Sequence, residues 1–110
     1  MDFILYYFPE CPYCQEFKQE ILPKLKNTNW GGMKVNFVEQ NTHDPEIKSY
    51  LESKSEANPR LTNRDRLRLK TVPHLAIKQN GNLYIWTGKN RTYENIVRWI
   101  QGEMAHSMKV

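Results

Sequence analysis

The sequence predicts an α/β domain built on one mixed four-stranded sheet, with elements in the order β-α-β-α-β-β-α and helices flanking the sheet. Residues 3–8 form a continuous apolar run, which is typical of a strand buried on both faces, and an apolar stripe of helical period follows it. Asn80-Gly81 lies between two short apolar runs and predicts a tight hairpin. The chain has 110 residues and fits a single domain that spans residues 1–110.

The first half of the chain predicts a βαβ unit with two parallel strands. Pro9 ends the first strand, and Pro12 suits the first turn of a helix because no backbone N–H is needed there. The apolar stripe of this helix consists of Cys14, Phe17, Ile21, Leu22 and Leu25. We expect Pro23 to kink the helix, and we place a loop at residues 27–32 and the second strand at residues 34–39.

A second helix is expected after that strand. Residues 41–44 are typical of a helix cap, and Pro45 opens a helix that we expect to run to about Ser53. The polar stretch of residues 52–70 contains a proline and has no clean period, so it predicts no single element.

The last part of the chain predicts an antiparallel hairpin and a final helix. A strand at residues 72–77 precedes the Asn80-Gly81 turn, and its partner strand continues until Gly88. Thr92 is a suitable N-cap for an amphipathic helix. We expect Gly102 to end this helix and the tail that follows to be loose.

Two cysteines, the only ones in the chain, stand at the junction of the first strand and helix as Cys11-Pro12-Tyr13-Cys14. A structural disulfide rarely spans so short a loop, because closing it removes little chain entropy. At a helix N-terminus, the unpaired N–H groups and the macrodipole favour a thiolate. Cys14 follows one helical turn later, within reach of Cys11. The pair therefore indicates redox chemistry.

Composition narrows the possible partners and location. No apolar run approaches the ~20 residues of a membrane helix, so we expect no membrane partner. Residues 1–8 lack the features of a signal peptide, and a cysteine pair in such a chain indicates a reducing compartment, so we expect a cytoplasmic protein. The net charge of +4 is mild and identifies no partner. We expect a monomer.

The cysteine motif, the later Thr71-Val72-Pro73, and the hairpin and helix after it together resemble the thioredoxin superfamily. The Cys-Pro-Tyr-Cys sequence itself resembles the active site of glutaredoxins. The resemblance implies a thioredoxin fold and thiol-disulfide oxidoreductase activity on protein or glutathione-mixed disulfides. It also implies a cis peptide bond before Pro73, which would expose the Val72 backbone so that substrate pairs with it like an added strand.

The electron donor is open between two alternatives. Many glutaredoxins have a lysine shortly before the first cysteine, whereas Glu10 stands at that point here. Gly88 with Arg91-Thr92 is more similar to the corresponding edge of thioredoxin and protein disulfide isomerase domains. The resemblance thus implies no tightly bound cofactor, and either glutathione as co-substrate or a donor of the thioredoxin-reductase type.

Each candidate residue has an expected role. Cys11 is expected to be the exposed thiol that attacks the substrate disulfide, and Cys14 resolves the mixed disulfide. Tyr13 either contacts substrate or shields the thiol. Residues 60–70 carry five basic side chains and one acidic one, and form either a rim that binds glutathione carboxylates or an acidic partner, or a solvated helix face. The candidate substrate-binding or glutathione-binding residues are Tyr13, Arg68, Thr71, Val72, Pro73 and Gly88.

Other interpretations rest on the histidines and the basic segment. A zinc site would need His43, His74 or His106 beside the cysteines, but none has the spacing of a ligand, so no metal is expected. His74 either relays a proton or, as we prefer, is a strand residue with a hydrogen-bonded ring. A non-catalytic redox switch or binding module would keep the same fold. Nucleic-acid binding is disfavoured, because the basic segment lacks an aromatic platform.

Overall fold

The structure is a computed structural model, and it describes residues 1–57, 73–86 and 90–108. Its centre is one four-stranded sheet in the order β2-β1-β3-β4. The strands are β1 (Asp2–Tyr7), β2 (Asn36–Asn41), β3 (His74–Gln79) and β4 (Asn82–Ile85). β1 pairs in parallel with β2 and antiparallel with β3, and β3 and β4 form an antiparallel hairpin. The predicted mixed sheet is confirmed.

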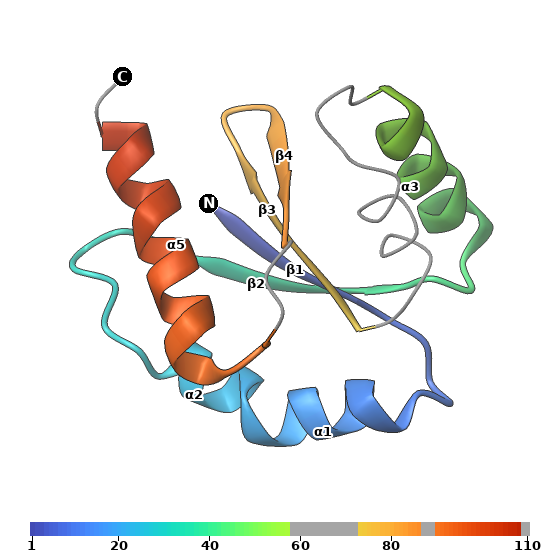
Figure 1. Cartoon of the computed structure of the whole chain (residues 1–110), viewed down its shortest axis with the longest axis horizontal. Helices are drawn as coiled ribbons and strands as arrows, with labels where there is room; N and C mark the ends of the chain where they lie inside the picture. The colour runs from blue at the N-terminus through green and yellow to red at the C-terminus, as the bar shows by residue number, and fades with distance from the viewer. Residues whose placement is uncertain (58–72, 87–89, 109–110) are drawn as a thin grey trace.

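Helices cover both faces of this sheet, as Figure 1 shows. The helices are α1 (Pro12–Glu20), α2 (Leu22–Lys26), α3 (Pro45–Ala57) and α5 (Tyr93–Met108). Phe3 and Leu5 of β1 pack against α1, α2 and α5, in the larger core cluster. Ile4 and Tyr6 face the other way and pack near Leu51 of α3. β1 is therefore buried on both faces, as its continuous apolar sequence predicts.

The first helix is broken rather than merely kinked. α1 ends at Glu20 and α2 begins at Leu22, with Ile21 at φ −101° and ψ −47° between them. Pro23 explains the break, because its ring clashes with the carbonyl four residues earlier and it has no N–H to donate. Both halves keep their apolar side toward the sheet, since Phe17, Leu22 and Leu25 are buried in one cluster.

Strand pairing moves several strand boundaries away from their predicted places: β1 begins and ends one residue earlier than residues 3–8, and β2 ends at Asn41 rather than at residue 39. β2 begins at Asn36, two residues later than expected, where it can pair with the start of β1 at Asp2. β3 runs to Gln79, directly before the hairpin turn, because its ladder with β4 continues to that turn. The partner strand β4 ends at Ile85. It does not continue into Trp86, so the predicted extension toward Gly88 is wrong; Gly88 itself lies outside the described residues.

Two helices are longer than the sequence predicts. α3 begins at Pro45 as expected but continues past Ser53 to Ala57. α5 passes through Gly102 and reaches Met108, so the predicted end at Gly102 is wrong. A glycine inside a helix only weakens it by about 1 kcal/mol relative to alanine, which is too little to stop a helix with good helix formers on both sides. None of the helices within the described ranges is long and apolar enough to cross a membrane.

The tight turn and the N-cap of the last helix agree with the sequence, and the tryptophans pack against the core. Asn80 and Gly81 both have positive φ, 53° and 80°, as the predicted Asn-Gly turn requires. The three tryptophans are partly buried and pack against the larger core cluster. Trp86 and Trp99 meet edge to face, with ring centroids 5.2 Å apart. The side-chain hydroxyl of Thr92 accepts from the backbone N–H of Asn95 at 3.3 Å, which confirms the predicted N-cap.

Substituting two glycines should change stability in opposite directions. Gly81→Ala should lower the free energy of unfolding by about 1 kcal/mol, because an alanine at φ +80° is strained although the space around it is open. Gly102→Ala should raise it by up to about 1 kcal/mol, because this glycine is helical and also faces open space. Urea denaturation measures both. Equal effects of the two changes would contradict a role for positive φ in the turn.

Candidate functional site

The chain passes from β1 into α1 through a turn that makes Cys11 the helix N-cap. The backbone N–H of Cys11 donates to the Phe8 carbonyl at 3.1 Å and closes this turn. Cys11 is extended, with φ −81° and ψ 111°, and its Sγ accepts from the backbone N–H of Cys14 at 3.1 Å. The sulfur therefore occupies the place that a serine or aspartate oxygen usually takes at an N-cap, at the positive end of the helix dipole.

Both cysteines are thiols, and both are buried. Cys14 is 0% exposed and Cys11 is 4% exposed, so the expectation of an exposed first thiol is wrong. The hydrogen bond from Cys14 explains this, because it draws the Cys11 sulfur inward over the first helical turn. The two side chains are held next to each other at one helix end.

The environment keeps Cys14 protonated at neutral pH. Burial, and then the hydrogen bond with Cys11, raise the pKa of Cys14 to about 12, while a hydrogen bond with the Phe8 backbone and the Lys18 ammonium act in the opposite direction. The two sulfur atoms therefore differ in their electrostatic surroundings. One sulfur faces helix amides that favour negative charge, and the other is a neutral thiol in the protein interior.

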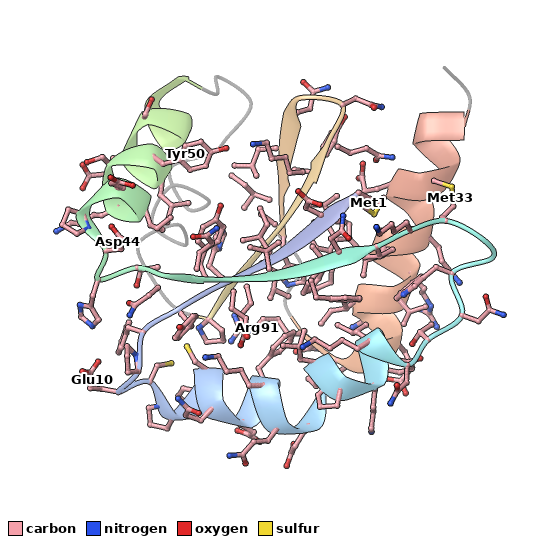
Figure 2. The ribbon with its side chains drawn as sticks, turned by 180° about the vertical axis from the view of Figure 1, so that it is seen from behind. Met1, Glu10, Met33, Asp44, Tyr50 and Arg91 are labelled. Carbon is pink, nitrogen blue, oxygen red and sulfur yellow. The ribbon has the colours of Figure 1, made fainter. Side chains whose placement is uncertain are left out.

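A cluster that sequence reasoning missed lies directly beside the cysteines. The Glu10 carboxylate is 3.2 Å from His43 Nε2, and the His43 ring meets Phe8 with centroids 5.1 Å apart. Figure 2 shows Glu10 at the turn between β1 and α1. His43 reaches it because Thr42 donates from its backbone N–H to the Tyr7 carbonyl at 2.7 Å. The signal was available, since the carboxyl ends of adjacent parallel strands meet at one sheet edge.

The structure brings Tyr13 and Pro73 to the same end of the sheet as the cysteines. Tyr13 lies in the first turn of α1 and is 69% exposed, so its side chain projects into solvent. Pro73 directly precedes β3, whose His74 is paired with Tyr6 near the carboxyl end of β1. The Pro73 carbonyl accepts from Arg91 Nη1 at 3.1 Å. Arg91 was not predicted as a site residue, and in the view of Figure 2 it lies between the sheet and α1.

Several predicted site residues lie outside the described part of the chain: Arg68, Thr71, Val72, Gly88 and the basic segment 60–70. The cis form of the bond before Pro73 stays a prediction for the same reason. Among the side chains that the structure describes, no three His, Cys, Asp or Glu residues gather as a metal site would require.

His74 is buried and stacks on Tyr6, with ring centroids 5.7 Å apart. Burial, and then the positive charge of Arg91, lower the pKa of His74 to about 4. Within the described residues, its buried Nε2 has no hydrogen-bond partner, so the expected hydrogen-bonded ring is not found at that atom. His74 is therefore a neutral side chain at physiological pH.

Comparison with known proteins gives no assignment. The sequence matches no family model. It matches no curated protein either.

Acid should destabilise the fold through His74. The pKa of His74 is about 4 in the folded protein, against an ordinary value of 6.5. The unfolded protein therefore binds the proton more readily, so the contribution of His74 to stability is complete above pH 6.5 and is lost as the pH falls toward 4. The loss should reach up to about 3 kcal/mol, measured by urea denaturation across this range. His74→Gln should remove this part of the pH dependence, whereas His43→Gln, at an exposed histidine, should retain it. The same pH dependence in wild type and His74→Gln would contradict this assignment.

Proposed function

We propose that this protein is a thiol-disulfide oxidoreductase with a thioredoxin fold, in which Cys11 is the nucleophile and Cys14 the resolving thiol. One observation carries the proposal: the Cys11 sulfur is the N-cap of α1 and accepts the backbone N–H of Cys14 at 3.1 Å. That position favours a thiolate and holds the second thiol within reach. The mixed sheet, with a parallel β1–β2 pair, an antiparallel hairpin and helices on both faces, is compatible with the proposed fold.

The reaction takes place in two exchange steps. The Cys11 thiolate attacks one sulfur of a substrate disulfide; a Cys11–substrate bond forms and the other substrate sulfur leaves as a thiolate, which takes a proton from water. Cys14 then loses its proton, and its thiolate attacks Cys11 Sγ. The Cys11–Cys14 bond forms, and the substrate leaves as a second thiolate. The protein has lost two electrons and the substrate disulfide has gained them.

The substrates on this proposal are disulfide-containing proteins or glutathione-mixed disulfides. The Cys-Pro-Tyr-Cys motif supports a glutaredoxin-like enzyme that takes electrons from glutathione. One observation favours the thioredoxin-like alternative, in which a flavoprotein reductase is the donor. Glu10 directly precedes Cys11 and its side chain is 73% exposed, so it places a negative charge where anionic glutathione would approach.

Replacing each cysteine separately should distinguish the first exchange step from the second. Cys11→Ser should reduce turnover to the uncatalysed rate, because a serine hydroxyl is not ionised at neutral pH. Cys14→Ser should abolish reduction of protein disulfides but, if glutathione is the donor, leave removal of glutathione from a mixed disulfide. Steady-state turnover measures both, with circular dichroism to confirm folding. Turnover by a folded Cys11→Ser protein would disprove the mechanism.

Two coupled assays run in parallel should identify the donor. One contains glutathione, glutathione reductase and a glutathione-mixed disulfide, and the other contains thioredoxin reductase and a protein disulfide. We expect turnover in at least one. Activity in the first alone assigns a glutaredoxin-like enzyme, and activity in the second alone assigns a thioredoxin-like one. If neither assay shows turnover while both thiols remain titratable, the protein is not an oxidoreductase of either type, and a redox switch or binding module remains.

A further inference from the structure

Lys18 occupies an unusual position for a lysine on the surface of a helix. It follows Cys14 by four residues on α1, so the two side chains lie on the same side of the helix. Its side chain is only 22% exposed, although lysine ammonium groups usually extend into water. Something holds this charge against the sheet.

Two contacts from the sheet hold the ammonium. Lys18 Nζ lies 3.3 Å from the centroid of the Tyr7 ring, on the last residue of β1. It also lies 3.4 Å from Glu39 Oε1 on β2. Three elements therefore converge on one positive charge.

The strand pattern explains why Glu39 faces this helix. Phe37 packs on Phe3 with ring centroids 5.7 Å apart, which puts it on the α1 side of the sheet. Glu39 follows two positions later along β2, and alternation gives it the same side. Tyr7 is on that side too, since it packs against the same core cluster as Phe3.

The ammonium acts on the buried thiol. Burial and Cys11 raise the pKa of Cys14; a hydrogen bond with the Phe8 backbone lowers it, and the positive charge of Lys18 lowers it further. Glu39 balances part of the charge, but its side chain is 42% exposed and its influence is screened by water. Once Cys11 is bound to substrate, its thiol no longer hydrogen-bonds to Cys14. Burial then opposes ionisation of Cys14, and the Phe8 backbone and Lys18 favour it.

We propose that Lys18 is a positioning residue that acts through Cys14: held on Tyr7 and Glu39, its ammonium stabilises the Cys14 thiolate during the resolving step. This inference rests on the proposed function. In that step Cys14 gives its proton to water, its thiolate forms the bond to Cys11 Sγ, and the bond from Cys11 to the substrate breaks. Lys18 stays protonated throughout and exchanges no electrons.

The test separates the two exchange steps with an aromatic disulfide reagent that releases one coloured thiolate for each bond broken. The first release reports attack by Cys11, and the second reports closure by Cys14. Lys18→Met keeps the length of the side chain but removes its charge, and Lys18→Arg keeps the charge. Lys24→Met is the matched control, because Lys24 is an exposed lysine on the neighbouring helix α2.

At pH 7, Lys18→Met should slow the second release by roughly three- to tenfold, as expected for the loss of one nearby, partly screened charge. The first release should change by less than about twofold. The pH profile of the second release should move to higher pH by a corresponding amount. Lys18→Arg and Lys24→Met should both retain the wild-type profile of the second release.

Two results would overturn the proposal. One is a second release in folded Lys18→Met that matches wild type, and the other is an equally slow second release in Lys18→Arg. Either result would make Lys18 a packing residue. If Lys18→Met does not fold, Glu39→Gln decides, because it leaves the ammonium on Tyr7 without its counter-charge; closure should then be at least as fast as in wild type, and slower closure contradicts the proposal. Failure of the proposed function itself would appear separately, as absent wild-type turnover with both donors.

Discussion

The carboxyl end of β1, at Tyr7, is the point on which the arrangement of the site depends. The Tyr7 carbonyl accepts hydrogen bonds from the backbone N–H and the hydroxyl of Thr42, at 2.7 and 3.1 Å. The Tyr7 ring carries the Lys18 ammonium on one side. Tyr6, the preceding residue, is paired with His74 on β3. The chain then turns into α1, so this one strand end positions the cysteines, the loop after β2 and the start of β3.

Burial of β1 on both faces surrounds that arrangement with apolar side chains and explains the electrostatics. A strand with a core on each side leaves little water near its end, so the polar groups there are either paired or neutral. Cys14 on one face and His74 on the other are both held in their uncharged forms, with pKa values of about 12 and about 4. Beside the cysteines, the Lys18 ammonium pairs with the Glu39 carboxylate, and the Glu10 carboxylate contacts the His43 ring.

Structural features set by residues adjacent in the sequence were predictable. The Asn80-Gly81 turn, the N-cap at Thr92 and the helix start at Pro45 each follow from the backbone preferences of one or two residues. The N-cap position of Cys11 was predictable for the same reason, because Pro12 fits the first helical turn. Boundaries set by pairing between distant segments, such as the start of β2 at Asn36, were displaced by two residues.

The sequence by itself determined the order of the elements, the mixed sheet and the cysteine pair at a helix start, since apolar periodicity and local turn chemistry specify these within short windows. Only the tertiary structure decided that Cys11 is buried, that Lys18 lies over Tyr7, and that His43 meets Glu10. These contacts join residues from different elements. Their geometry depends on strand register and on the helix packed across the sheet, which no local pattern encodes.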